Sequence, residues 1–229
     1  LYLQEDVTMS KHILMVVTTA DKMKENHSTG LWLSEFGEAY VEFEKAGFTI
    51  TVASPLGGKA PVDARSLEGE TSQEILNTAK HLENTLKLDA ITDSAKFDAV
   101  FLPGGHGTMF DLPDNQTLHA LIRELYEGDK VVAAVCHGPA GLVGVTLSDE
   151  KPLVEGKDVA AFTDDEERET TLDRFMPFLL ETRLRELGAN VVTAPNWTDN
   201  VQADGNLITG QNPQSTISVA KAVVKQLLK

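Results

Sequence analysis

The stretch from Lys130 to Gly141 (KVVAAVCHGPAG) constrains the fold of this chain most strongly. A short apolar, β-branched run that leads at once into small residues and proline is typical of a buried parallel strand ending in a tight turn. The only cysteine of the chain, Cys136, lies at that junction. Because open α/β sheets bind ligands at the carboxyl ends of their strands, we expect the Cys136 thiol to point into a functional site.

Strand and helix patterns alternate along the rest of the chain. Apolar runs predict strands at 12–19, 48–53, 97–102, 130–135 and 190–194, a strand pair or hairpin within 152–162, and a hairpin at 201–209. Helical periodicity predicts a helix through Phe36–Phe43 ending near Gly47, and helices at 72–86, 116–127, 174–187 and 213–228, the last with Ile217, Ala220, Val224 and Leu227 facing inward. The segments 54–70 and 163–169 are expected to be loops. This alternation predicts an α/β fold whose parallel-centred sheet carries helices on both faces, with a nucleophile elbow at Cys136.

Length and composition fit one domain, which we expect to cover residues 9–229. The apolar fraction of 41% can build a full core, and a single cysteine allows no internal disulfide and no multi-cysteine zinc site. We expect residues 1–8, which precede Met9, to be a tag or a disordered N-terminal extension. The sequence shows no spanning apolar run and no signal peptide, so we expect a cytoplasmic protein with no membrane partner.

The charge balance excludes one class of partner. The chain has 20 Lys and Arg against 35 Asp and Glu, a formal charge of −15. Binding to nucleic acid or to an anionic membrane needs a basic face, so neither is expected.

Cys136 and His137 form the central candidate pair. A lone cysteine in a core strand is most often inert, but Cys136 ends its strand, precedes small residues and has a histidine beside it. The helix N-terminus expected after the elbow would favour the thiolate. Residues alone leave an inert thiol and a nucleophile as equal alternatives, and His137 as either a general base or a histidine bound to a loop carbonyl.

Acidic residues offer partners for this pair. A base at His137 needs a carboxylate, and the densest acidic cluster is Asp164, Asp165, Glu166 and Glu167, although such a run is usually a solvated surface. Glu35 lies in an apolar segment. It is either an ordinary residue at a helix N-terminus or a half-buried carboxyl that hydrogen-bonds the thiol.

The remaining motifs are weaker. Gly104 and Gly105 follow a strand and suit backbone N–H donation to an oxyanion, although an ordinary turn would look the same. His106 and the other histidines show no metal-ligand spacing, and no Gly-rich phosphate-binding motif is present. We therefore expect no metal and no cofactor.

At these residues the chain resembles the ThiJ/PfpI superfamily, relatives of the class I glutamine amidotransferases, and within it the glyoxalase III and heat-shock chaperone branch. The matching segments are Thr29-Gly30 with Glu35, Leu102–Thr108 (LPGGHGT), Ala133–Pro139 (AAVCHGP), Phe162–Glu167 (FTDDEE), Pro177–Glu181 (PFLLE) and Leu207–Pro213 (LITGQNP). The Cys-His-Gly elbow is specific to the superfamily, and its combination with Glu35 and the acidic segment indicates the branch.

The resemblance implies a flavodoxin-like three-layer sandwich. It implies Cys136 as nucleophile, His137 as its base, Glu167 rather than Glu166 as the acid that orients His137, and Glu35 as the carboxyl that contacts the sulfur. Oxyanion and substrate-binding groups are expected at Gly104, Gly105, His106 and Gly138. A homodimer would be usual for the superfamily.

The expected activity is that of a cofactor-independent glyoxalase III-type lyase (D-lactate dehydratase). It would convert methylglyoxal or glyoxal, small aldehyde substrates, and water into the hydroxy acid through a Cys136 hemithioacetal. One alternative is a cysteine peptidase, amidohydrolase or protein deglycase of the same superfamily. The other is non-enzymatic, a holding chaperone or redox-stress sensor.

Overall fold

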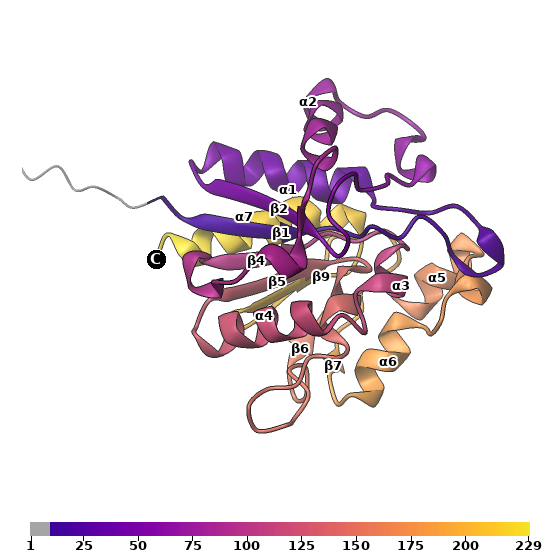
Figure 1. Cartoon of the computed structure of the whole chain (residues 1–229). Coiled ribbons are helices and arrows are strands. Elements are labelled where there is room, and N and C mark those ends of the chain that lie inside the picture. The colour runs from indigo at the N-terminus through magenta and orange to yellow at the C-terminus, as the bar shows by residue number, and fades with distance from the viewer. Residues whose placement is uncertain (1–9) are drawn as a thin grey trace, which may run out of the picture.

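The computed structural model describes residues 10–229, and the segment 1–8 expected to be a tag or extension lies outside them. A seven-stranded sheet forms the centre (Figure 1). Its strands, in spatial order, are β3 (Leu86–Lys87), β2 (Thr49–Ser54), β1 (His12–Val16), β4 (Ala99–Leu102), β5 (Val131–Val135), β9 (Leu207–Gly210) and β8 (Val201–Asp204). All neighbours pair in parallel except β8 and β9. Without its two edge strands the order is that of flavodoxin-like folds, as expected.

Helices cover both faces of the sheet (Figure 1). Alternate residues of β1 show the division, since Ile13 and Met15 pack in one core cluster and Leu14 and Val16 in the other. The first cluster lies under α1 (Leu33–Lys45) and α7 (Thr216–Leu227), and the second under α4 (Gln116–Glu127). The central strands β1, β4, β5 and β9 are therefore buried on both faces, as their near-continuous apolar sequences require.

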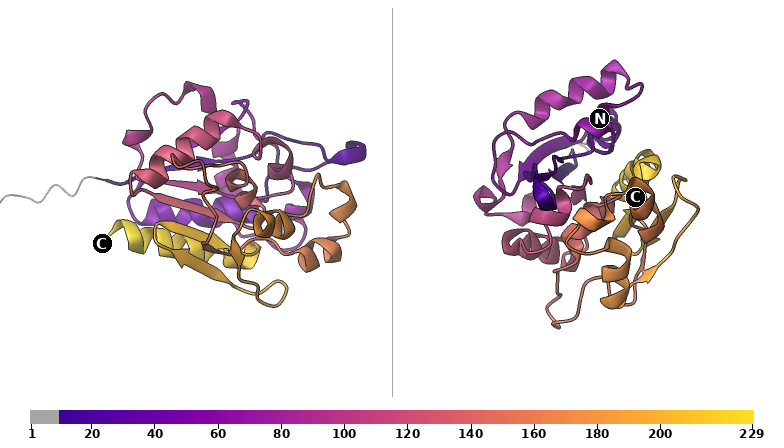
Figure 2. Two further views of the ribbon diagram at one scale, coloured as in Figure 1. Left: turned by 90° about the horizontal axis from the view of Figure 1, so that it is seen from below. Right: turned by 90° about the vertical axis from the view of Figure 1, so that its right-hand side faces the viewer.

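The remaining elements are short. They are α2 (Gln73–Asn77), α3 (Thr108–Asp111), α5 (Asp164–Thr170), α6 (Leu180–Glu186) and a second, two-stranded sheet of β6 (Asp158–Val159) and β7 (Asn190–Val191). Single 3₁₀ turns occur at Lys24–Asn26, Ala64–Leu67, Thr78–Leu82, Leu88–Ala90, Ser94–Lys96, Gly138–Leu142, Asp173–Phe175 and Pro213–Ser215. Figure 2 shows α2 and the α5–α6 segment on well-separated sides of the sheet. Within the described residues no helix is both long and apolar enough to cross a bilayer.

Several predicted elements are wrong. The acidic stretch 163–169 is a helix, α5, because Thr163 and Glu166 form a capping box at its start and acidic side chains favour its first turn. The helix predicted at 174–187 begins only at Leu180, since Pro177 holds the preceding Met176 in an extended conformation.

Three further expectations also need correction. The segment 152–162 forms no hairpin, because its one strand, β6, pairs in parallel with β7, which is all that remains of the strand predicted at 190–194. The helix predicted at 72–86 ends at Asn77 and continues only as a 3₁₀ turn. In the last helix, Ile217 is 40% exposed and Val219 and Val223 face the core instead.

Candidate active site

Cys136 sits in a strained turn directly after β5. Its φ is 62°, in the left-handed region that residues with a Cβ rarely adopt. Its N–H donates to the carbonyl of Gly210 at 3.0 Å, and its carbonyl accepts from the N–H of Phe162 at 3.0 Å. Such strain costs roughly 1–3 kcal/mol and persists only where the surroundings impose it. The local geometry is therefore that of a nucleophile elbow at the carboxyl end of a central strand.

Gly138, expected among the substrate-binding groups, packs against the neighbouring strand. A Cβ at this position would overlap the carbonyl oxygen of Leu102, the last residue of β4. Glycine is therefore required because the backbone of the turn lies directly on β4.

Glu35 lies in the first turn of α1 and is completely buried. Its Oε1 accepts a hydrogen bond from the N–H of Gly104 at 2.8 Å, and its carboxyl also interacts with the Cys136 thiol. Its Oε2 has no hydrogen-bond partner by distance and angle within residues 10–229. Burial raises the pKa of Glu35 to about 8, although the hydrogen bond from Gly104 lowers that pKa by a smaller amount. The carboxyl beside the sulfur is therefore protonated at neutral pH.

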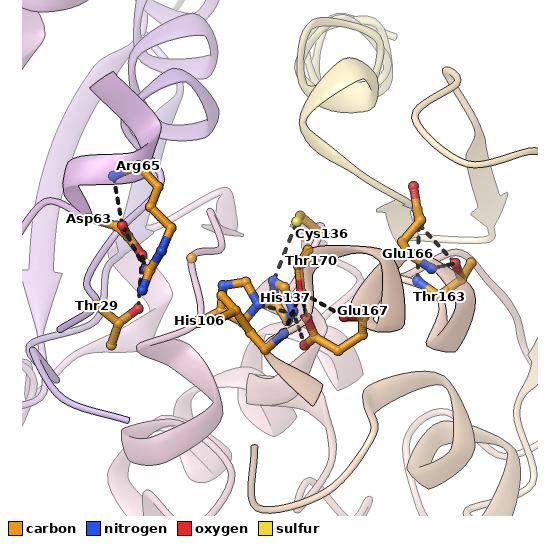
Figure 3. Close-up of polar contacts among 12 residues, drawn as sticks. Thr29, Asp63, Arg65, His106, Cys136, His137, Thr163, Glu166, Glu167 and Thr170 are labelled. Carbon is orange, nitrogen blue, oxygen red and sulfur yellow. Dashed lines mark hydrogen bonds and ion pairs between the residues drawn. The ribbon is translucent and has the colours of Figure 1, made fainter. Parts of the chain in front are cut away.

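His137 lies between the sulfur and Glu167 (Figure 3). Its Nε2 lies 2.8 Å from Oε1 of Glu167, and its Nδ1 lies 3.5 Å from the Cys136 Sγ. Burial would raise the pKa of Glu167, but its electrostatic interaction with the nearby His137 ring and the hydrogen bonds of His106 and His137 outweigh burial and hold that pKa well below its usual range. An ionised carboxylate only accepts, so Nε2 carries the hydrogen and Nδ1 is free to accept from the thiol.

The protonation state of Cys136 differs from the expectation. The turn that follows it is a 3₁₀ helix of five residues, and burial together with the carboxyls of Glu35 and Glu166 raises the pKa of the thiol. Burial and the charge of His106 lower the pKa of His137. The resting pair is thus a neutral thiol facing a neutral imidazole, and the helix N-terminus that was expected to favour the thiolate is only a short 3₁₀ turn.

Gly104 and Gly105 approach the elbow closely. A Cβ on Gly104 would lie 2.7 Å from the backbone nitrogen of His137, and one on Gly105 would overlap the carbonyl oxygen of Gly30. Gly105 also has a φ of 110°. The N–H groups of Gly105 and His137 donate no hydrogen bond within residues 10–229. Two backbone donors beside a thiol can bind a developing oxyanion.

His106 makes a contact that the sequence did not predict. It was expected among the oxyanion and substrate-binding groups, but its ring Nε2 lies 2.7 Å from Oε2 of Glu167. The rings of His106 and His137 are 4.1 Å apart between centroids, and both side chains are buried. One carboxylate therefore faces two imidazoles (Figure 3).

Glu166 serves a different part of the structure from Glu167. Its carboxylate is fully buried and accepts hydrogen bonds from Thr163, Trp197, Gln211 and Asn212. It does not contact His137 by any hydrogen bond found in residues 10–229. Its place is in the network that joins α5 to the loops before and after the β8–β9 hairpin.

Sequence reasoning missed two groups around this site. Thr170, at the end of α5, places its Oγ1 2.6 Å from the backbone carbonyl oxygen of Glu167 and 3.0 Å from Oε2 of the same residue. The Phe162 ring packs against the His137 ring at 4.3 Å between centroids. The capping box Thr163-x-x-Glu166 would have predicted α5, and a helix places Thr170 three residues after Glu167 on the same face.

The long loop 54–70 is fixed next to the segment that carries Glu35. Asp63 is buried, accepts from Thr29 Oγ1 at 3.1 Å and forms an ion pair with Arg65 at 2.8 Å (Figure 3). Arg65 also donates to the carbonyl of Ser28 at 3.2 Å. The loop is thus anchored beside the start of α1.

One group of residues could hold a metal ion. The ligand atoms of His106, His137 and Glu167 lie within 4.8 Å of one another, although sequence spacing gave no sign of it. Separations of 2.7 and 2.8 Å between imidazole nitrogen and carboxylate oxygen are hydrogen-bond distances. The three side chains are therefore complete without an ion, and the absence of a metal stays a prediction.

A flavodoxin-like sandwich with a buried cysteine at a strand–turn elbow and a histidine–glutamate pair beside it defines a class of α/β proteins with a cysteine-centred site. The chain belongs to the DJ-1/PfpI family, whose sequence model matches residues 16–226. The resemblance to the ThiJ/PfpI superfamily is therefore confirmed.

Individual relatives agree with this assignment. The glutathione-independent glyoxalase hsp3102 of Schizosaccharomyces pombe is 34% identical, over 89% of this chain and 91% of the relative. The crystal structure of glyoxalase III from Candida albicans is 26% identical and aligns with a TM-score of 0.84, over 94% of this chain and 96% of the other. A further crystal structure, 50% identical, aligns with a TM-score of 0.91 over 96% and 99% of the two chains.

Proposed function

We propose that this protein is a cofactor-independent glyoxalase of the glyoxalase III type, which converts methylglyoxal or glyoxal and water into the 2-hydroxy acid. The observation that carries the proposal is the pairing of the Cys136 thiol with two different proton-transfer groups. One is the base His137, 3.5 Å from the sulfur, and the other is Glu35, which is protonated at neutral pH. The chain also covers most of the length of relatives named as glutathione-independent glyoxalases.

The first step is addition of the thiol to the aldehyde. Nδ1 of His137 takes the thiol proton as sulfur bonds to the aldehyde carbon, and Glu167 stabilises the imidazolium through Nε2. The aldehyde oxygen becomes an oxyanion that the N–H groups of Gly105 and His137 bind, and protonation gives a hemithioacetal. The neutral resting state of the pair is suited to this step, because the thiolate forms only as the new bond does.

The second step moves hydrogen between adjacent carbons. A base removes the proton from the hemithioacetal carbon while an acid protonates the neighbouring carbonyl oxygen, which gives an enediol. Glu35 supplies the acid, because its carboxyl is protonated beside the sulfur. Return of a proton to the second carbon yields a thioester of the 2-hydroxy acid.

Hydrolysis of the thioester completes the reaction. Water, activated by the imidazole of His137, attacks the thioester carbonyl and restores the thiol. Methylglyoxal and one water thus become lactate with no net oxidation or reduction, so the reaction requires no redox cofactor.

Burial separates this proposal from the peptidase, amidohydrolase and deglycase alternatives. Cys136 is only 3% exposed, and Glu35, His137 and Glu167 are buried as well. A two- or three-carbon aldehyde needs far less space around the sulfur than an extended peptide or a side chain attached to a folded protein. A small aldehyde is therefore the better substrate, and the homodimer stays a prediction.

The test is formation of D-lactate from methylglyoxal without glutathione, by the wild-type protein and by Cys136→Ala. We expect turnover by the wild type and loss of at least about a thousandfold in the variant, as for removal of other nucleophiles. Wild-type protein without turnover, or a Cys136→Ala variant with full activity, would contradict the proposal. A peptide panel and a glycated-protein substrate measured in parallel would reveal either alternative activity.

A further inference from the structure

His106 forms a buried interaction that the proposed reaction does not use. Its Nε2 donates to Glu167, and its Nδ1 has no hydrogen-bond partner within residues 10–229. The bond to Glu167 is thus the single hydrogen bond of this ring. The centroid of the His106 ring lies 4.1 Å from that of His137 and 6.2 Å from that of Phe162.

Stability alone gives no reason for an imidazole here. A buried polar atom without a partner is unfavourable, and an apolar side chain of similar size would avoid that cost. By contrast, the buried carboxylate of Glu166, the residue before Glu167, is satisfied by several donors. The interaction with Glu167 is therefore the feature that distinguishes His106 from an ordinary core residue.

The donors on Glu167 are divided between its two oxygens. His106 donates to Oε2 at 2.7 Å, and His137 alone donates to Oε1 at 2.8 Å. The Thr170 hydroxyl lies 3.0 Å from Oε2, but it is closer to the backbone carbonyl oxygen of Glu167, at 2.6 Å. With Oε2 held by His106, which comes from a different segment of the chain, the carboxylate plane is kept from rotating away from His137. Oε1 consequently stays aligned with the His137 ring.

From this division we infer that His106 is a positioning residue for the His137 base and acts through Glu167. It fixes the carboxylate so that His137 keeps its hydrogen on Nε2 and presents a bare Nδ1 to the sulfur. Without it, the carboxylate would rotate, and a hydrogen on Nδ1 would block acceptance of the thiol proton. The effect of His106 on turnover rests on the proposed function, whereas the effect of His106 on the His137 tautomer does not.

Two substitutions separate the hydrogen bond from the packing. In His106→Gln the side-chain amide can donate to Oε2 from a position close to that of Nε2, so positioning should be retained. In His106→Leu the volume stays similar and the donor is lost. His119→Gln is the control, because His119 is another buried histidine with an unpartnered Nε2, on α4 and away from Glu167.

The test combines nitrogen-15 NMR of the histidine rings with kcat and KM for methylglyoxal. We expect His137 to hold its hydrogen on Nε2 in the wild type, in His106→Gln and in His119→Gln, and to show mixed tautomers in His106→Leu. We expect kcat to fall by about 10- to 100-fold in His106→Leu with KM changed by less than about threefold, and to stay within about threefold in His106→Gln.

A single Nε2–H tautomer of His137 in His106→Leu would overturn the inference, as would equal loss of kcat in the Gln and Leu variants. If His106→Leu does not fold, His106→Met removes the same donor with a more adaptable apolar side chain and should shift the tautomer in the same direction. An unchanged tautomer in that variant would overturn the inference. A wild-type protein that shows the expected tautomers but produces no lactate would contradict the proposed function and leave the positioning role supported.

Discussion

Glu166 and Glu167 are consecutive residues of α5, yet their carboxylates serve two separate networks. Glu167 binds the imidazoles of His137 and His106 (Figure 3). Glu166 instead accepts hydrogen bonds from Trp197, Gln211 and Asn212. Successive residues of a helix point about 100° apart, which sends the two side chains in different directions. One turn of α5 therefore supplies both the carboxylate that faces the histidines of the site and the carboxylate that anchors the outer loops.

This division predicts different effects on activity for two isosteric substitutions. Glu167→Gln should lower kcat by at least about a hundredfold, because an amide can donate to His137 and disturb its tautomer, and it should also lower stability, because the two histidines favour the ionised carboxylate. Glu166→Gln should lower the free energy of unfolding by roughly 2–4 kcal/mol, because its NH₂ would face donors that now have no acceptor. Lactate assays and urea unfolding of both variants check this. Equal loss of activity in both would contradict the division of roles.

Glu35 should make the protein less stable as pH rises. The folded protein keeps the Glu35 proton up to about pH 8, whereas its ordinary pKa is 4.5, so the folded state binds more protons between these values. The free energy of unfolding therefore falls through that window, by up to roughly 5 kcal/mol for a shift of this size.

Glu35→Gln removes this dependence. We expect the variant to gain stability relative to the wild type between about pH 5 and about pH 9, measured by urea unfolding at both values. Glu44→Gln, an exposed change on the same helix, is the control and should show no such gain. Parallel stability curves for the wild type and Glu35→Gln would show that Glu35 is ionised in the folded protein.

The strained backbone at Cys136 predicts an unusual tolerance of glycine. Replacing alanine by glycine inside a strand usually costs roughly 0.5–1 kcal/mol, and Ala134→Gly in β5 should show that loss. At position 136, with a φ of 62°, Cys136→Gly should be more stable than Cys136→Ala by about 1 kcal/mol, because glycine adopts this conformation without strain. Thermal and urea unfolding of the variants measure both differences. A Cys136→Gly variant less stable than Cys136→Ala would mean that the turn is not strained.

The sequence predicted the centre of the molecule well for physical reasons. Long apolar runs and a clear helical period leave few alternatives, so the helix at 116–127 and the strand that leads to Cys136 were located correctly. The elbow was predicted from the small residues that come directly after that strand. Glu35 and Glu167 came from the family resemblance rather than from spacing, since nothing local distinguishes Glu167 from Glu166.

What the sequence could not predict depends on tertiary contacts. The ring of His106 meets Glu167 only because the ends of β4 and β5 and the start of α5 converge, and these residues are 61 positions apart in the chain. The raised pKa of the thiol follows from complete burial and nearby carboxyls, which a strand pattern does not encode. The helix α5 (Asp164–Thr170) was not predicted for another reason: the run of acidic residues was interpreted as a solvated loop, although Thr163 and Glu166 carry a capping signal.

Alkylation of Cys136 should depend on reagent size and on pH. The thiol is 3% exposed, and burial and the Glu35 carboxyl raise its pKa, so at neutral pH the thiolate that reacts is scarce. We expect native protein to react with iodoacetamide at least about tenfold more slowly than the unfolded chain, and a bulky maleimide to be slower still.

The pH dependence of this reaction identifies the role of Glu35. In the wild type the rate should continue to rise above pH 8.5, about the pKa of an ordinary cysteine. In Glu35→Gln the rise should occur at lower pH, since the neighbouring carboxylate that forms above about pH 8 is absent. Because Cys136 is the only cysteine, mass spectrometry of the intact protein follows its modification directly. A native rate equal to that of the unfolded chain, or identical pH profiles for the two proteins, would show that burial and Glu35 do not control the thiol.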